Sequence, residues 1–151
     1  MLCRDVMRRP VHCAKTNDSA ESAARRMQDA NIGFIPVCDE HDVLVGVLTD
    51  RDLALRICAQ NRSAAETQVA EILTPTVVRC RAEDDLSRAE ELMAQQRISR
   101  IVVTDSDGRA EGVISLSDVA MADAPHAAEI LREVASRELL DFEGTRQPSS
   151  P

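Results

Sequence analysis

Aromatic residues are nearly absent from this chain of 151 residues, which has two phenylalanines, Phe34 and Phe142, and no tyrosine or tryptophan. Single-stranded nucleic acids bind to proteins by stacking bases on aromatic rings, so this composition excludes a stacking platform. Basic residues are also in the minority, and the formal net charge is −8. Duplex nucleic acid requires a basic face that neutralises phosphates, so we expect no nucleic-acid partner. An anionic small ligand would therefore need locally placed arginines.

Long hydrophobic runs are missing as well. No apolar run is long enough to span a bilayer, and the first residues lack the apolar core of a signal peptide. We therefore expect a cytoplasmic protein with no membrane partner.

The cysteines are odd in number and scattered, and none forms a CxxC pair, which excludes the usual metal-ligand spacing. In a reducing compartment we interpret them as small buried hydrophobic residues, and we predict no metal site. A redox or metal sensor that uses Cys13, Cys80 or other thiols stays open as an alternative.

Common enzyme motifs are absent too: GxGxxG, the phosphate-binding P-loop, GxSxG and HExxH do not occur. The three histidines, His12, His41 and His126, are far apart in the sequence and have no obvious catalytic partners. We therefore predict no catalytic residues, no required cofactor and no enzymatic activity.

The chain does contain an internal repeat. A shift of 66 residues aligns it with itself without a gap, so that Gly46 falls on Gly112 and Asp52 falls on Asp118. A fixed period of this kind indicates one supersecondary unit present twice. Each half has roughly 60 residues, a size that buries too little surface to be comfortably stable alone. We therefore expect the two halves to share a core.

The hydrophobic pattern predicts the order strand, helix, strand, strand, helix in each repeat, an α/β (α+β) fold. Asp18 and Asp84 are the expected N-caps of the first helices, with Glu21 completing a capping box in the first repeat. An Asp-Gly turn over residues 105–108 predicts a hairpin. The expected organisation is repeat one over 1–60, a linker over 61–70, repeat two over 71–123, a C-terminal helix over 124–142 and a disordered tail over 143–151.

One motif occurs in both repeats: glycine, two apolar residues, serine or threonine, two variable residues, then aspartate, over 46–52 and 112–118. A strand that ends at a hydroxyl residue where a helix begins presents unpaired backbone N–H groups, which suit phosphate. An aspartate one turn later can accept both hydroxyls of a ribose. The same residues also fit a helix capping box, and both interpretations stay open. The glycines leave room for a ligand or for a neighbouring strand.

These motifs, together with residues 5–7, 32–39 and 98–105, resemble two cystathionine-β-synthase-type (CBS) domains between residues 5 and 123. The resemblance implies two β-α-β-β-α units with pseudo-twofold symmetry and two clefts between them. It implies that the clefts bind adenosine compounds such as AMP, ADP, ATP or S-adenosylmethionine. It further implies a regulatory homodimer that signals to an unknown regulated protein. A structural interaction module with degenerate clefts and no ligand is the alternative.

The resemblance also implies roles for individual residues. Thr49 and Ser115 would lie near phosphate, and Asp52 and Asp118 would hold the ribose. Groups that cradle the adenine are implied near Val11, Ile35 and Pro36, and near Val77, Ile101 and Val102. Two arginines are candidates for neutralising phosphate, namely Arg51 beside Asp52, and Arg100, whose counterpart in the first repeat is Phe34.

Overall fold

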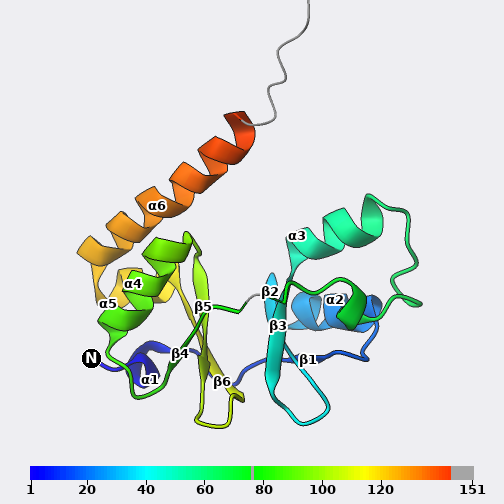
Figure 1. The fold of residues 1–151 in the computed structure, drawn as a ribbon, viewed down its shortest axis with the longest axis horizontal. Helices are drawn as coiled ribbons and strands as arrows, with labels where there is room; N and C mark the ends of the chain where they lie inside the picture. Colours follow the sequence, from blue (N-terminus) through cyan, green and yellow to red (C-terminus); the bar gives the residue numbers. More distant parts are fainter. Residues whose placement is uncertain (76, 144–151) are drawn as a thin grey trace, which may run out of the picture.

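The computed structural model of the chain describes residues 1–75 and 77–143, with side chains as far as residue 137. Two halves lie side by side, each with a three-stranded sheet facing the other half and helices on its outer side (Figure 1). Both halves have the predicted order β-α-β-β-α. All but the first residue of the predicted disordered tail lies outside the described residues.

The elements of the first half are β1 (Ala14–Lys15), α2 (Ala20–Ala30), β2 (Phe34–Cys38), β3 (Leu44–Thr49) and α3 (Asp50–Leu53), which continues as the π-helical η1 (Ala54–Cys58). Those of the second half are β4 (Arg79–Arg81), α4 (Leu86–Gln96), β5 (Arg100–Thr104), β6 (Ala110–Ser115) and α5 (Leu116–Ala122). In each sheet the first strand is parallel to the second, which pairs with the third in antiparallel fashion.

Three further helices complete the fold. Two are short, α1 (Cys3–Val6) and the 3-10 helix η2 (Val69–Glu71), and they occupy equivalent positions before the first strand of each half. The third, α6 (Ala124–Glu143), follows α5 and rises away from the second half (Figure 1). Among the described helices, none has the length and apolar character needed to cross a membrane.

The hydrophobic core consists of two clusters, one in each half. The prediction of a single core shared by the two halves is therefore wrong. Cys3 and Met7, near the start of the chain, pack into the core of the second half. Val69 and Ile72, which precede the second half in sequence, pack into the core of the first. Each half is therefore completed by a segment that leads into the other, and this exchange adds apolar burial that a unit of this size needs.

Glycines permit the close approach of these exchanged segments. The N–H of Arg8 donates to the carbonyl of Val113 in β6 at 2.9 Å, and the N–H of Thr74 donates to the carbonyl of Val47 in β3 at 2.8 Å. A Cβ on Gly112 would lie 2.5 Å from Sδ of Met7, and one on Gly46 would lie 2.7 Å from the carbonyl oxygen of Thr74. The two motif glycines thus make room for a neighbouring segment of chain.

The hairpins of the two halves meet at equivalent positions. Val43 and Arg109, which are 66 residues apart, form an antiparallel bridge, and the N–H of Leu44 donates to the carbonyl of Gly108 at 3.0 Å. A contact between equivalent positions places a pseudo-twofold axis between the hairpins.

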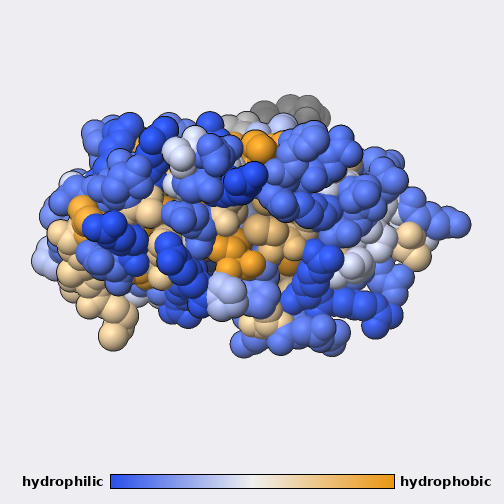
Figure 2. Space-filling view, turned by 90° about the horizontal axis from the view of Figure 1, so that it is seen from below, coloured by the Kyte–Doolittle hydropathy of each residue, from blue (hydrophilic) through white to orange (hydrophobic). Residues whose placement is uncertain are grey.

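On the face seen from below, hydrophobic residues gather in the middle with polar residues on both sides (Figure 2).

Helices α2 and α4 begin one residue later than predicted. Their N-caps are Ser19, whose Oγ accepts from the N–H of Ser22 at 3.0 Å, and Asp85, whose Oδ1 accepts from the N–H of Ser87 at 3.0 Å. The predicted caps are wrong because the carboxylates of Asp18 and Asp84 reach backwards. They accept from the N–H groups of residues 15 and 81, at 2.9 and 2.8 Å, and so close the turn after the first strand. Nor does Glu21 complete a capping box; its carboxylate pairs with Arg25.

Candidate functional site

The corner where the third strand of each half meets the following helix is built in the same way twice. The N–H of Thr49 donates to Oδ2 of Asp52 at 2.9 Å, and the N–H of Asp52 donates to Oγ1 of Thr49 at 3.1 Å. Ser115 and Asp118 exchange the corresponding hydrogen bonds at 2.8 and 3.3 Å. The capping-box interpretation is therefore confirmed at both corners. Each aspartate uses Oδ2 for the cap, which leaves Oδ1 for another partner.

At the second corner this other partner is Arg8. Its Nε donates to Oδ1 of Asp118 at 2.6 Å, and the Asp118 side chain is only 9% exposed. Burial raises the pKa of Asp118, but the hydrogen bonds from Ser115 and Arg8 outweigh burial, so the net pKa is lowered. Asp118 is thus an ionised carboxylate whose charge is balanced by Arg8. Arg8 could not be predicted as part of this corner, since nothing in its immediate sequence shows that it reaches α5.

At the first corner no arginine stands in the place of Arg8, because the equivalent residue is Thr74. The nearest cation is Arg56, with Nη2 3.7 Å from Oδ1 of Asp52. Nη1 of Arg56 donates to the carbonyls of Ile72 and Leu73, at 2.6 and 3.0 Å, so this side chain also holds the exchanged segment in place. The two corners therefore share their cap but differ in their charge.

A cavity of about 430 Å³ opens between the two halves at the second corner. This volume falls within the ~300–1,000 Å³ typical of small-molecule sites. The lining comes from both halves and includes five of the predicted site residues: Val11, Pro36, Arg100, Ser115 and Asp118. It also includes residues that were not predicted as site residues, among them Arg8, Arg9, His12, Asn31 and Ser117.

The charges that line the cavity are mainly positive. Arg8, Arg9 and Arg100 face a single acid, Asp118. Arg8 is paired with that acid, and Arg9 lies 3.9 Å from Glu111. Arg100 is exposed and has no ion-pair partner among the described residues. The cavity therefore holds an uncompensated positive charge, which suits an anionic group of a ligand.

Arg100 and Phe34, equivalent positions in the two repeats, line the same cavity. Phe34 begins β2 and pairs in register with Thr49, and Arg100 begins β5 and pairs with Ser115. The pseudo-symmetry thus brings an aromatic ring and a guanidinium to one site, the ring for a flat apolar group and the guanidinium for an anion.

The remaining predicted site residues lie elsewhere. Thr49, Arg51 and Asp52 lie at the start of α3, outside the lining of this cavity. Ile35 and Ile101 are fully buried in the two cores, and Val102 is also buried. Val77 is half-buried and follows residue 76, which lies outside the described residues. The ligand-binding roles of all twelve selected residues stay predictions.

The cysteines fit the packing interpretation with one exception. Cys3, Cys38 and Cys80 are buried and Cys13 is half-buried, whereas Cys58 is exposed at the end of η1, so the prediction that it packs as a buried hydrophobic residue is wrong. A hydrogen bond with Cys3, together with burial, raises the pKa of the Cys80 thiol. A hydrogen bond with Cys38, together with burial, raises the pKa of the Cys13 thiol in the same way.

Comparison with known proteins shows the same architecture. The family described as "CBS domain" matches the chain twice, over residues 3–58 and 69–125. A similar protein, the CBS domain-containing protein YhcV of Bacillus subtilis, is 37% identical over 118 residues, which are 78% of this chain and 82% of that protein. An L-aspartate semialdehyde sulfurtransferase of Methanocaldococcus jannaschii is 30% identical over 118 residues, but the match spans 78% of this chain and only 22% of that protein.

Similar solved structures include Hypoxic Response Protein I with two coordinated zinc ions, with a TM-score of 0.73 and 25% identity over 80% of this chain and 98% of that one. They also include a CBS domain pair in complex with 5′-methylthioadenosine and S-adenosyl-L-methionine, with a TM-score of 0.72 and 28% identity over 83% of this chain and 97% of that one. Since both repeats match the family and the fold matches its solved pairs, the chain belongs to the CBS-domain family and contains a tandem CBS pair.

Proposed function

We propose that this CBS pair is a non-catalytic regulatory module that binds an adenosine nucleotide in the cavity at the second corner and transmits the binding to a partner protein. The observation that supports it most is the composition of the cavity. Apolar side chains of Val11, Phe34 and Pro36 line it together with the Ser115–Asp118 corner and with Arg8, Arg9 and Arg100. That combination fits the three parts of a nucleotide: base, ribose and phosphate.

The proposed arrangement follows from the chemistry of each part. The adenine lies against Phe34 and Pro36, the ribose hydroxyls donate to Oδ1 of Asp118, and phosphate lies near Arg100. Since Arg8 already donates to Oδ1 of Asp118, a ribose at that oxygen displaces Arg8, which is 73% exposed and free to turn towards phosphate. Binding would thereby move the segment that joins α1 to β1, and a ligand shifts such an equilibrium only by its differential affinity for the two states.

The positive charge of the cavity favours some adenosine compounds over others. The solved CBS pair described above binds 5′-methylthioadenosine and S-adenosyl-L-methionine, neither of which carries phosphate. The cavity of this chain contains the uncompensated Arg100, which attracts phosphate and repels a sulfonium cation. We therefore place AMP, ADP or ATP ahead of S-adenosylmethionine as the regulatory ligand, as expected of a module that senses energy state.

Calorimetric titration of the full chain with AMP, ATP, adenosine and S-adenosylmethionine tests this proposal. Asp118→Ala should lower the affinity for every adenosine compound at least tenfold. Arg100→Ala should lower the affinity for ATP and AMP but leave the affinity for adenosine unchanged. Asp52→Ala is the matched control, because it removes the equivalent acid at the other corner. An Asp52→Ala effect as large as that of Asp118→Ala, or the same response of adenosine and ATP to Arg100→Ala, would contradict the assignment.

One observation favours the second candidate function, a structural interaction module without ligand. Both hydroxyl–aspartate pairs are used as helix caps, and the remaining oxygen of Asp118 is occupied by Arg8. This alternative predicts that no adenosine compound at millimolar concentration changes the melting temperature. It also predicts that Asp52→Ala still lowers the free energy of unfolding by about 1 kcal/mol, a typical loss for a cap.

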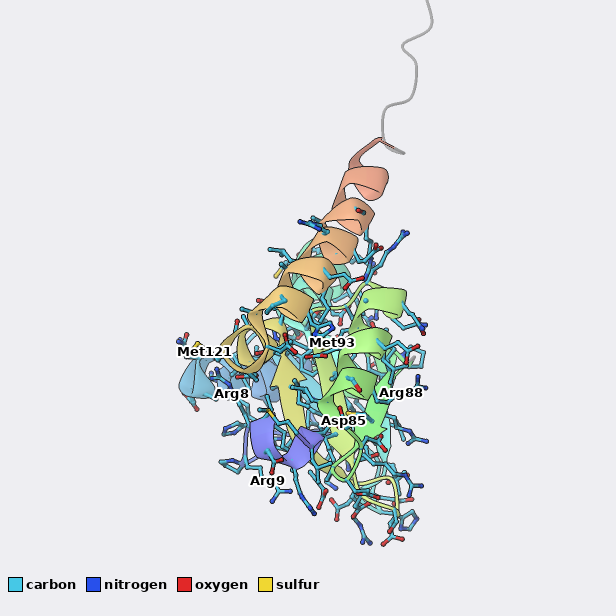
Figure 3. The ribbon with its side chains drawn as sticks, turned by 90° about the vertical axis from the view of Figure 1, so that its left-hand side faces the viewer. Arg8, Arg9, Asp85, Arg88, Met93 and Met121 are labelled. Carbon is cyan, nitrogen blue, oxygen red and sulfur yellow. The ribbon has the colours of Figure 1, made fainter. Side chains whose placement is uncertain are left out.

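We also propose that the regulatory unit is a homodimer. Leu55 and Met121 occupy equivalent positions on the helices that follow the two corners, and they are 50% and 91% exposed. Met121 lies at the edge of the molecule in Figure 3. Exposed apolar side chains at symmetric positions fit a face that is covered by a second copy. Light scattering should give twice the chain mass for the wild type and a smaller mass for Leu55→Glu with Met121→Glu; a wild-type monomer at micromolar concentration would exclude the dimer.

A further inference from the structure

Three potential metal ligands converge where α6 begins. Glu90 projects from α4, Asp123 lies between α5 and α6, and His126 lies in the first turn of α6. One ligand atom from each lies within 4.8 Å of the others. Nδ1 of His126 is 2.8 Å from Oδ2 of Asp123 and 3.8 Å from Oε2 of Glu90. The cluster is separate from the cavity at the second corner, and none of its members lines that cavity.

Glu90 is the member of this cluster that needs explanation. Its side chain is only 7% exposed, and Oε1 is buried without a hydrogen-bond partner, the only such side-chain atom in the described part of the chain. A buried carboxylate in this position is costly unless a cation or a donor satisfies it. Burial also raises the pKa of Glu90, and the charged groups that face it are His126, Asp123 and Asp85.

A protonated His126 does not meet this need by itself. Its Nδ1 proton serves Asp123, which is within hydrogen-bond distance, whereas Oε2 of Glu90 lies beyond that distance and Oε1 has no partner. Glu129 adds a third carboxylate to the surroundings of the imidazole, after Asp123 and Glu90, and Asp85 faces Glu90. The local charge is therefore strongly negative around a single titratable base.

A divalent cation would satisfy all three side chains at once. One imidazole nitrogen and two carboxylates are suitable donors for zinc and related transition ions, with an open position left for water. Ligands at ~2.0–2.2 Å from a tetrahedral ion are separated by about 3.3–3.6 Å. The distances from Nδ1 of His126 to Oδ2 of Asp123 and to Oε2 of Glu90, 2.8 and 3.8 Å, lie on either side of that range, so small side-chain movements suffice. His126 is 57% exposed, which gives an ion access from solvent.

We propose that Glu90, Asp123 and His126 bind one divalent transition-metal cation of the zinc class, which ties the start of α6 to α4. The bound imidazole is neutral and keeps its proton on Nε2, so binding to the protonated ring releases the Nδ1 proton to solvent. Ala127 and Ile130 of α6 already pack into the core of the second half. The ion therefore fixes the end of α6 from which the rest of the helix leaves the domain.

Cobalt titration of the full chain followed by absorption spectroscopy tests the site, since Co²⁺ reports its own ligands. We expect one equivalent to bind with weak d–d bands and without intense thiolate-to-cobalt charge transfer. His126→Gln should weaken binding at least tenfold, whereas the matched control His41→Gln, in the exposed turn between β2 and β3, should have no effect. Zn²⁺ should raise the melting temperature of the wild type and of His41→Gln but not that of His126→Gln.

Glu90→Gln separates loss of the site from loss of the fold. It keeps the shape of the buried side chain and removes the charge that lacks a partner, so the metal-free variant should melt no lower than the wild type while its Co²⁺ affinity falls at least tenfold. Failure of the wild-type chain to bind Co²⁺ or Zn²⁺ would overturn the proposal. So would thiolate charge-transfer bands, which would place the ion at the cysteines, or equal affinity of the wild type and His126→Gln.

Discussion

Arg8 and Asp118 form a direct ion pair, with Nε 2.6 Å from Oδ1, although they lie 110 residues apart in the sequence. The pair exists because the segment that follows α1 packs along β6, the strand that ends at the corner occupied by Asp118. The same exchange in the other half brings Thr74, which carries no charge, beside β3. The second corner therefore contains a counter-ion for its aspartate, and this distinguishes two corners that are otherwise related by pseudo-symmetry.

Removing the guanidinium of Arg8 should destabilise the chain modestly. We expect Arg8→Ala to lower the free energy of unfolding by about 0.5–1 kcal/mol, because Asp118 is buried but the guanidinium of Arg8 is largely exposed to solvent, which screens the pair. Arg9→Ala is the matched control: its ion pair is long, at 3.9 Å, and largely exposed, so its removal should change stability by less. Denaturant titration measures both variants. Equal losses for the two would show that the Arg8–Asp118 pair makes no special contribution.

Stability should depend on the ionisation of Asp118 at acid pH. Its pKa in the folded chain is lowered below the ordinary value of 3.8, so the ionised form stabilises the fold above that value. This contribution is lost as the pH falls through the lowered pKa. We expect the difference in melting temperature between the wild type and Asp118→Asn to be constant from pH 7 to pH 5 and to shrink below pH 3.8. A difference that grows on acidification would reverse the sign that we assign to the shift.

The motif glycines should tolerate no side chain. A Cβ on Gly46 would meet the backbone carbonyl of Thr74 at 2.7 Å, which cannot move without breaking the bridge to β3. We therefore expect Gly46→Ala to cost about 1–3 kcal/mol, as for other overpacked sites. Gly33→Ala is the control, because its Cβ would meet only the Asp50 side chain, which can swing away. Thermal unfolding should give a lower melting temperature for Gly46→Ala than for Gly33→Ala, and the opposite order would refute the role given to Gly46.

Thiol reactivity should follow burial. In the native chain Cys58 is exposed, whereas Cys3, Cys38 and Cys80 are buried. We expect Ellman's reagent to titrate one thiol rapidly and the others slowly, and Cys58→Ser to abolish the rapid phase. Rapid reaction of the Cys13 or Cys80 thiol would instead support the redox-sensor alternative.

The repeated fold could be predicted from the sequence because the pattern that defines it is local and occurs twice. Gly46 and Gly112, Thr49 and Ser115, and Asp52 and Asp118 recur at a constant spacing, and each pair occupies an equivalent position in the structure. The predicted caps of α2 and α4 are each wrong by one residue, because adjacent residues can cap a helix equally well. Only the backward hydrogen bonds of Asp18 and Asp84 decide between them.

The charge of the cavity could not be predicted in this way. Arg8 and Arg9 reach the second corner through the exchange of segments between halves, and this exchange depends on packing between residues far apart in the sequence. The candidate metal site could not be predicted either, since the sequence neighbours of Glu90 on α4 are those of an ordinary helix face. The asymmetry between Arg8 and Thr74 was nevertheless visible in the 66-residue alignment, and it is the kind of difference that separates two sites on a duplicated fold.

A crystal structure of the chain grown with millimolar ATP tests the proposed nucleotide site most directly. We predict density for one nucleotide in the cavity of about 430 Å³, with its ribose at Asp118, its phosphates near Arg100 and the Arg8 side chain released from Asp118. A cavity without nucleotide density under these conditions, with Arg8 still bound to Asp118, would contradict a nucleotide-binding function and leave a purely structural module.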